Sequence, residues 1–297
     1  MRHQPLPPVV ASDTVLPTVS GQPGRRAVIS LPKARPSGRF VISQQAPGHG
    51  EAAATGDVAV VAYTAVVWRN GKALPGPYDE GGRPLLVPLG RATTLPALDR
   101  AVQGRRAGSR VLVVAPPAAA YGSDGSPKSG VTGTDTVVFV VDVLKIVRAH
   151  ATVDGDQAGV PDSLPQVRVD RRSATAAIAV PDHKAPGRLV KQTLTAGHGP
   201  VVRAGRQVVL QQSTAVWQQG RDDARLVMSS QAGGGPLPVV IGRGNVIKGW
   251  DEAVVGQRVG TRLLLVIPPD KAFGPHSPKG IPDGAVLVSV IDILATV

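Results

Sequence analysis

The amino-acid sequence predicts an α+β protein built from two similar domains, each an antiparallel sheet wrapped around one short helix. Three observations support this prediction. The chain has 297 residues, enough for two domains of ordinary size. Its two halves repeat each other along most of their length. Each half also contains several runs of β-branched residues and leaves room for one short helix.

The repeat is clearest between residues 90–122 and 242–274, which align without a gap and share 15 identical residues at 33 positions. Further upstream, Gly-His-Gly at 48–50 matches Gly-His-Gly at 197–199. Units of this size are whole domains rather than the short repeats of a solenoid. We therefore expect a duplicated domain.

The limits of the repeat divide the chain into four parts. Residues 14–148 and 162–297 form the two domains, each with an N-terminal arm ahead of its main strands. Residues 149–161 are polar and contain glycine, so we expect a flexible linker there. Residues 1–13 are rich in proline and are predicted to be disordered.

The elements of the first copy follow in order along the chain. Residues 58–68 form a β-branched run between two glycines, residues 110–115 form a strand that stops at two prolines, and residues 136–147 form the closing strand. A helix is predicted over 96–103, because proline occupies its first position and Gly104 follows its last. Strands that surround a single helix indicate the α+β class.

One face of the predicted helix is apolar in both copies. Leu98 and Val102 lie four residues apart and therefore share a face, and Trp250 and Val254 hold the same positions in the second copy. We expect this face to pack on the sheet.

Composition and charge exclude several kinds of function. The chain has no cysteine, which rules out disulfides, thiol nucleophiles and cysteine-based metal sites. The net charge of +12 is scattered, without the basic clusters and interleaved aromatic residues of a nucleic-acid binder. No apolar stretch is long enough to be a transmembrane segment, and no signal peptide is visible. His49 and His198 lack ligands at metal-binding spacing, so we expect no metal site.

The motifs of the two copies follow a specific order. In the second copy, Gly-Arg-Gly-Asn-Val-Ile-Lys-Gly-Trp-Asp-Glu-Ala-Val at 242–254 precedes Pro-Pro-Asp-Lys-Ala-Phe-Gly at 268–274 and Ile-Pro-Asp-Gly-Ala at 281–285. The first copy has Val-Ala-Tyr-Thr at 61–64 and Pro-Ala-Ala-Ala-Tyr-Gly at 117–122. This order resembles that of FKBP-type peptidyl-prolyl cis-trans isomerases. The tandem arrangement is similar to that of two-domain FKBP-type lipoproteins of actinobacteria.

The resemblance implies two FKBP-like domains, each with an apolar pocket between its helix and its sheet. It implies isomerisation of Xaa-Pro bonds without a cofactor or a covalent intermediate. The partners it implies are proline-containing unfolded or partly folded polypeptides and macrolide-type ligands. The similar tandem proteins are exported, so the resemblance also implies an extracytoplasmic location.

In the first copy, the family's catalytic positions hold three aromatic residues and one residue that would offer its backbone N–H. These residues are Tyr63, Tyr121, Phe139 and Leu95. The substrate-binding positions hold Leu74, Leu85 and Leu98. Leu98 replaces the tryptophan that forms the pocket floor in the family, and the family's Phe-Asp pair falls at Leu74-Pro75, so its aspartate is absent.

The second copy departs from the family at other positions. Its catalytic positions hold Trp250, Ile247 and Phe273. Its substrate-binding positions hold Val227, Leu237, Val246 and Ile281. The strand tyrosine of the family becomes Gln212, and the last-strand phenylalanine becomes Ser289.

Two functions of different classes therefore remain open. The retained Tyr63, Tyr121 and Trp250 favour a peptidyl-prolyl isomerase that acts on polypeptide chains. The replacements at Leu98 and Gln212 favour a peptide-binding or chaperone protein whose FKBP-like pockets do not catalyse.

Overall fold

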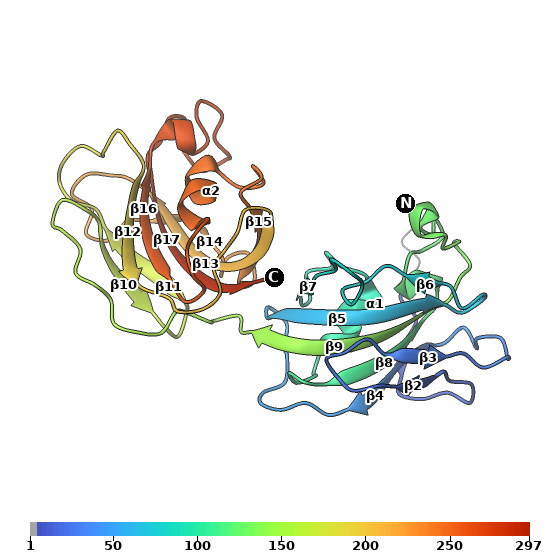
Figure 1. The fold of residues 1–297 in the computed structure, drawn as a ribbon. Coiled ribbons are helices and arrows are strands. Elements are labelled where there is room, and N and C mark those ends of the chain that lie inside the picture. The colour runs from blue at the N-terminus through green and yellow to red at the C-terminus, as the bar shows by residue number, and fades with distance from the viewer. Residues whose placement is uncertain (1–4) are drawn as a thin grey trace. The chain divides into compact units, whose positions relative to one another are not determined.

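The computed structural model describes residues 5–297 and divides into two compact units between Ile146 and Val147. We call Met1–Ile146 domain 1 and Val147–Val297 domain 2. Each unit has one α-helix and one main sheet, which confirms the predicted α+β class (Figure 1). No helix in the described part of the chain is long and apolar enough to cross a membrane.

Domain 1 is built on one sheet with the strand order β1-β4-β8-β9-β5-β6, and β7 pairs with β5 as well. These strands are β1 (Val9–Val10), β4 (Phe40–Ala46), β5 (Val58–Val67), β6 (Ala73–Leu74), β7 (Leu85–Pro88), β8 (Arg110–Ala115) and β9 (Val137–Val147). The β4–β8, β8–β9 and β5–β7 pairs are antiparallel, whereas β1 runs parallel to β4. Two 3-10 turns, η1 (Pro117–Ala119) and η2 (Pro127–Ser129), lie between β8 and β9.

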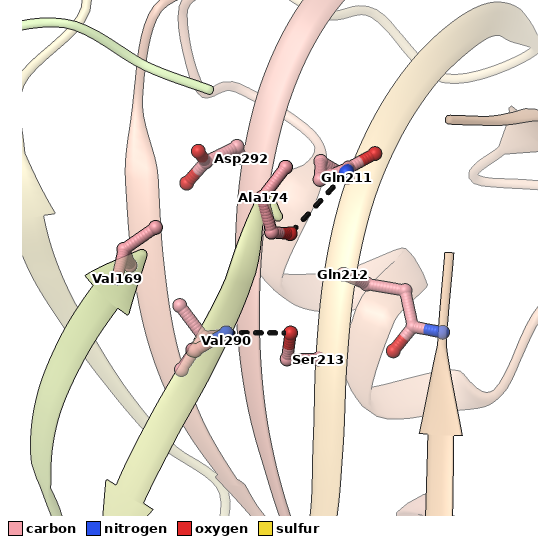
Figure 2. A pocket seen from close by; sticks show the side chains of 8 residues that line it. Val169, Ala174, Gln211, Gln212, Ser213, Val290 and Asp292 are labelled. Carbon is pink, nitrogen blue, oxygen red and sulfur yellow. Dashed lines mark hydrogen bonds between the residues drawn. The ribbon is translucent and has the colours of Figure 1, made fainter. Parts of the chain in front are cut away.

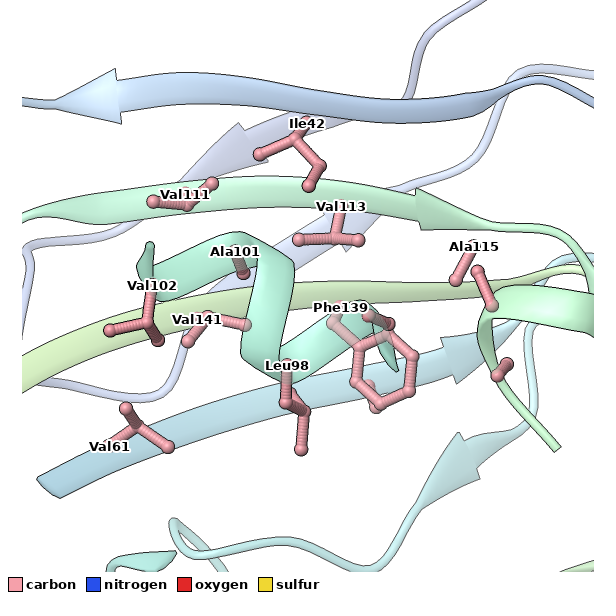
Figure 3. Packing of buried hydrophobic residues seen from close by; sticks show 14 of the residues in the cluster. Ile42, Val61, Leu98, Ala101, Val102, Val111, Val113, Ala115, Phe139 and Val141 are labelled. Carbon is pink, nitrogen blue, oxygen red and sulfur yellow. The ribbon is translucent and has the colours of Figure 1, made fainter. Parts of the chain in front are cut away.

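The helix α1 (Pro96–Val102) covers one face of this sheet, which we call the inner face. Its buried residues Leu98 and Val102 lie in one core with Val113 of β8 and Phe139 of β9 (Figure 3). The alternation of strand side chains explains the arrangement, because every second residue of β8 and β9 turns toward the helix. The predicted apolar helix face is therefore the face that packs on the sheet.

The opposite, outer face of the sheet is covered by the N-terminal arm. The arm forms an antiparallel hairpin of β2 (Thr18–Ser20) and β3 (Val28–Ser30). Val19 and Ile29 of this hairpin pack against Leu112 of β8 and Val140 of β9. Domain 1 thus has three layers, in the order helix, sheet and hairpin.

Domain 2 repeats this plan. Its main sheet has the strand order β12-β16-β17-β13-β14, with β15 also paired to β13. The elements are β10 (Gln166–Asp170), β11 (Thr175–Ala179), β12 (Val190–Thr195), β13 (Arg206–Val216), β14 (Leu226–Ser229), β15 (Leu237–Ile241), α2 (Lys248–Val254), β16 (Arg262–Ile267), η3 (Pro269–Lys271) and β17 (Leu287–Thr296). The hairpin β10–β11 covers the outer face, as β2–β3 does in domain 1.

A buried ion pair ties the arm to the sheet in domain 1. On the outer face of domain 1, the Arg110 Nε donates to Asp142 over 2.7 Å, and both side chains are 2% exposed. Other nitrogens of Arg110 donate to the arm carbonyls of Gly21 and Arg25, and the Tyr78 hydroxyl donates to Asp142. Such a pair is stable in the interior only when its remaining polar atoms are hydrogen-bonded, as they are here.

Two segments differ from their sequence predictions. Within residues 1–13, predicted to be disordered, Val9 and Val10 form strand β1, while residues 1–4 lie outside the described part of the chain. Within residues 149–161, predicted to be a flexible linker, Val153 is 3% exposed and its N–H donates to Asp292 over 2.8 Å. This part of the segment is held against domain 2, because it supplies polar partners to the Arg262–Asp292 ion pair.

Candidate functional site

The structure brings all seven predicted residues of the first copy into one cluster on the inner face of domain 1. We call this cluster site 1; its members are Tyr63, Leu74, Leu85, Leu95, Leu98, Tyr121 and Phe139. They come from strands β5, β6, β7 and β9, the start of α1 and the turn after β8. The resemblance to the family therefore identified side chains that lie together, although they are far apart along the chain.

Aromatic side chains form one wall of site 1. The rings of Tyr63 and Phe139 meet edge to face, with centroids 5.7 Å apart and planes at 77°. Phe139 is fully buried, whereas Tyr63 and Tyr121 are half-buried. Burial raises the pKa of both tyrosines above 10.0, and the proximity of Tyr121 raises that of Tyr63 further. Both phenols are therefore protonated hydrogen-bond donors at neutral pH.

The residue before each helix is held in an extended conformation. Leu95 has φ −56° and ψ 134°, and Ile247 has φ −58° and ψ 143°. The carbonyl of Leu95 accepts from the N–H of Leu98, and the carbonyl of Ile247 accepts from the N–H of Trp250, both over 2.9 Å. These capping bonds fix the backbone of Leu95 and Ile247 at the edge of the core, so each backbone N–H has a defined direction.

All seven predicted residues of the second copy also gather, on the inner face of domain 2. We call this cluster site 2; its members are Val227, Leu237, Val246, Ile247, Trp250, Phe273 and Ile281. Trp250 and Ile281 are buried and the other five are partly buried. Phe273 follows η3 at the position that Tyr121 holds after η1, so domain 2 keeps the ring there and lacks the hydroxyl.

The two sites fill the same space with opposite pairs of side chains. Site 1 places the small Leu98 on the helix and the large Phe139 on the last strand. Domain 2 places the large Trp250 on the helix and the small Ser289 on the last strand, where the Trp250 Nε1 donates to the Ser289 Oγ over 3.2 Å. In each domain a large side chain on one element is thus paired with a small one on the other, as a close-packed interior requires.

The residue before Leu98 or Trp250 in the helix is also matched to the size of its neighbour on the sheet. Domain 1 has Ala97 in its helix and Ala115 in β8, and both are fully buried. Domain 2 has Gly249 and Ile267 at these positions. A Cβ on Gly249 would approach the Ile267 side chain to 2.5 Å, so glycine is the residue that fits beside the larger isoleucine. In each domain, the side chains of the helix therefore fit those of the strand that they contact.

A chain of hydrogen bonds crosses the inner face of domain 2. It starts with the bond from Trp250 to Ser289, continues through a 2.9 Å bond between the hydroxyls of Ser289 and Thr214, and ends with the Thr214 Oγ1 donating to the Gln212 Oε1 over 2.8 Å. Sequence reasoning identified Gln212 and Ser289 as departures from the family but missed Thr214. Alternation along β13 could have found it, because Thr214 lies two residues from Gln212 on the same face.

Sequence reasoning also missed a pair of clefts at the outer ends of the central strands. A cleft of about 540 Å³ lies beside Trp68 in domain 1, and one of about 580 Å³ lies beside Trp217 in domain 2. Each indole Nε1 donates over 3.1 Å to a carbonyl of the arm, Ala34 or His183. Trp68 and Trp217, which occupy equivalent positions in the two copies, therefore anchor the arms to the sheets.

A much smaller cavity of about 10 Å³ lies under the β10–β11 hairpin, between Val169, Ala174, Gln211 and Asp292 (Figure 2). The Gln211 Nε2 donates to the carbonyl of Ala174 over 3.2 Å. A space of this size holds one water molecule at most, so it is a detail of outer-face packing rather than a ligand site.

Comparison with known proteins identifies the family. A model of the family described as FKBP-type peptidyl-prolyl cis-trans isomerase matches residues 49–144 and residues 202–294. One match falls in each domain, and together they cover more than half of the chain. The chain belongs to the FKBP-type peptidyl-prolyl cis-trans isomerase family and contains two domains of this type.

Several named proteins are similar to parts of the chain. The FK506-binding protein of Streptomyces anulatus is 35% identical over 118 residues, which are 39% of this chain and 91% of that protein. FK506-binding protein 4 of Mycosarcoma maydis is 37% identical over 105 residues, 35% of this chain and 26% of that protein. Peptidyl-prolyl cis-trans isomerase FKBP9 of Rattus norvegicus is 26% identical over 206 residues, 69% of this chain and 29% of that protein.

Two solved structures are also similar to parts of this chain. The three FKBP domains of wheat FKBP73 cover 86% of this chain and 94% of their own, with 18% identity and a TM-score of 0.35. FkpA from Escherichia coli covers 36% of this chain and 47% of its own, with 30% identity and a TM-score of 0.32.

Proposed function

We propose that the chain catalyses cis-trans isomerisation of Xaa-Pro bonds, with a proline ring held at site 1 or at site 2 against the helix. The observation that supports this proposal most directly is the clustering at the start of each helix. In both domains, apolar and aromatic side chains surround the residue before the helix, Leu95 or Ile247. This clustering persists although the two domains differ at most of the side chains concerned.

Rotation about a peptide bond has a barrier of about 18–20 kcal/mol, because resonance gives the C–N bond partial double-bond character. The twisted transition state loses this resonance, and its amide is less polar than the planar ground state. An apolar surrounding therefore favours the twisted form over the planar one, which lowers the barrier. No proton transfer or covalent bond is required, which is consistent with sites made mainly of leucine, valine, isoleucine and aromatic residues.

In site 1, Leu98 would contact the proline ring, and Phe139 and Tyr63 would form the wall beside it. The Tyr121 hydroxyl and the N–H of Leu95 would bind carbonyl oxygens of the peptide on either side of the proline. These are the roles that the family assigns to the matching positions. The raised pKa of Tyr121 supports its part, since a protonated phenol can donate.

In site 2, the indole of Trp250 would contact the proline ring, and Phe273 and Ile281 would form the walls. The N–H of Ile247 would bind one peptide carbonyl. Trp250 offers a larger apolar surface to the ring than Leu98 does, whereas site 1 keeps the tyrosine hydroxyl. We therefore expect the two sites to bind the same peptide with different strengths.

A second candidate function is peptide binding without catalysis. The smaller aromatic wall of domain 2 favours it there, because Gln212 and Ser289 stand where site 1 has Tyr63 and Phe139, so less apolar surface surrounds the peptide amide. The names of the relatives also suggest macrolide ligands of the FK506 type, which we expect at the same two sites.

The test is isomerisation of a short Leu-Pro reporter peptide by the full chain. Uncatalysed exchange takes about 10–100 s at 25 °C, so modest acceleration is visible. Two variants separate the sites, Tyr121→Phe for site 1 and Trp250→Leu for site 2, since each introduces the residue type that the other domain already holds. Trp217→Leu is the matched control, because this buried tryptophan lies on the outer face.

We expect acceleration by the wild-type chain, a lower rate in at least one site variant and an unchanged rate in Trp217→Leu. A folded wild-type chain that leaves the rate at its uncatalysed value, yet binds the peptide, would establish the second candidate function instead.

A further inference from the structure

Gln212 holds a position on β13 that matches the position of Tyr63 on β5. Its neighbours in sequence, Gln211 and Ser213, face the hairpin on the outer side, where the Ser213 Oγ accepts from the N–H of Ala176. The side chain of Gln212 projects to the opposite side of β13 from Ser213, toward the inner face (Figure 2). Gln212 is 6% exposed, so its amide lies at the edge of the domain 2 core.

The hydrogen-bond chain from Trp250 to Gln212 has a single possible direction. An indole N–H can only donate, so the Ser289 Oγ accepts from Trp250. An amide oxygen can only accept, so the Thr214 hydroxyl donates its one proton to the Gln212 Oε1. The bond between Ser289 and Thr214 must then use the proton of Ser289.

The bond from Thr214 to the Gln212 Oε1 orients the Gln212 amide. Its oxygen is turned toward Thr214, and therefore its nitrogen is turned away from the chain of hydroxyls. Within residues 5–297, the Gln212 Nε2 has no hydrogen-bond acceptor. The nitrogen is not one of the fully buried polar atoms without a partner in this part of the chain. It is therefore partly accessible to solvent.

Domain 2 otherwise lacks a side-chain donor of the kind that site 1 has. Site 1 offers the hydroxyls of Tyr63 and Tyr121, and domain 2 has Gln212 and Phe273 at those positions. The Trp250 N–H is already used, because it donates to Ser289. The amide nitrogen of Gln212 is thus a hydrogen-bond donor with a fixed orientation, in the domain that has neither tyrosine hydroxyl.

We infer that Gln212 is the side-chain hydrogen-bond donor of site 2, and that it binds a carbonyl oxygen of the peptide beside the proline. The assignment rests on the proposed function and deepens it, because it makes Thr214 and Ser289 positioning residues that orient the amide. It also gives the two sites different specificity. Site 1 presents hydroxyls that can donate or accept, whereas Gln212 presents an N–H group that can only donate.

Nuclear magnetic resonance of the full chain tests this assignment directly. The probe is the tetrapeptide Ala-Leu-Pro-Phe, added to chain labelled with ¹⁵N. We expect the side-chain NH₂ resonances of Gln212 to shift with the indole resonance of Trp250, at the same peptide concentration. The NH₂ resonances of Gln211 are the internal control, because this neighbouring amide lies on the outer face and is bonded to Ala174.

Two matched variants complete the experiment. Gln212→Glu at pH above 7 keeps an oxygen for Thr214 and replaces the donor by a second oxygen, whereas Gln211→Glu makes the same change on the outer face. We expect Gln212→Glu to weaken peptide binding at site 2 by at least about 3- to 10-fold, the effect of one lost hydrogen bond. We expect Gln211→Glu to bind the peptide as strongly as the wild-type chain does. In Gln212→Glu, the peptide-dependent shifts at Tyr121 in site 1 should be unchanged. Thr214→Val should reproduce part of the loss of affinity at site 2.

The outcomes separate the two proposals. If Trp250 responds to the peptide while Gln212 does not, or if both glutamine variants bind equally, the donor assignment is wrong and the proposed function stands. If neither domain responds to the peptide and the reporter is not accelerated, the proposed function is wrong and the donor assignment fails with it.

Discussion

Exchanging two side chains of domain 1 for those of domain 2 tests whether the helix and the last strand share one packing space. The perturbation is Leu98→Trp on α1 combined with Phe139→Ser on β9, which recreates the Trp250 and Ser289 pair. Leu98 is 2% exposed and Phe139 is fully buried, so each single change acts on a close-packed core.

The magnitudes follow from burial. Removing the Phe139 ring leaves a cavity, and changes of this kind cost about 3–5 kcal/mol in the free energy of unfolding. The ring also loses its edge-to-face contact with Tyr63, a pair of a type worth about 0.5–1.5 kcal/mol. Leu98→Trp alone overfills the core and costs about 1–3 kcal/mol. In the double variant the indole occupies the space that the ring vacates, so we expect a cost about 1–3 kcal/mol below the sum.

The assay is a double-mutant cycle by denaturant unfolding of the full chain, with the transition of domain 2 as an internal reference. Adding Ala65→Thr should recover further stability, because Ala65 matches Thr214, which bonds to Ser289 in domain 2. Strictly additive costs for Leu98→Trp and Phe139→Ser would refute the reasoning, since side chains that share no space have no coupling energy.

Three further predictions concern two buried carboxylates and the tryptophan of site 2. Asp142→Asn should destabilise domain 1 by about 3–5 kcal/mol in denaturant unfolding, because it leaves the Arg110 charge buried without a carboxylate; a cost below 1 kcal/mol would contradict this. Hydrogen bonds from Arg69 lower the pKa of Asp135 to about 2 from 3.8. The ionised Asp135 therefore stabilises folded domain 1 fully above about pH 4, and this contribution is lost as the pH falls through about 2. Thermal unfolding between pH 2 and 5 should show a smaller pH dependence in Asp135→Asn. The Trp250→Leu variant should lose the peptide-dependent fluorescence change of the chain, which Trp217→Leu should retain.

The family motifs and the spacing of apolar residues in the helix made the inner face predictable from the sequence. Strand runs and the proline at the first position of α1 are local signals, and the family motifs placed Tyr63, Phe139 and Trp250 at positions that the structure brings into sites 1 and 2. The roles of these residues stay predictions.

The outer face was harder to predict. The arm strands are short, with Val19 and Ile29 as their inward residues, and so few residues give little periodic signal. The role of Thr214 depends on a partner on another strand, Ser289, which no local pattern reveals.

The hydrogen bonds of Val153 determine where an independently folding second domain has to begin. The N–H of Val153 donates to Asp292, and its carbonyl accepts from Arg262. A fragment that starts at residue 162, where the repeat begins, would expose a buried carboxylate and guanidinium that have each lost a backbone partner. A fragment that starts at Val147 keeps both, so it should melt at the higher temperature, although the added residues lie outside the duplicated sequence.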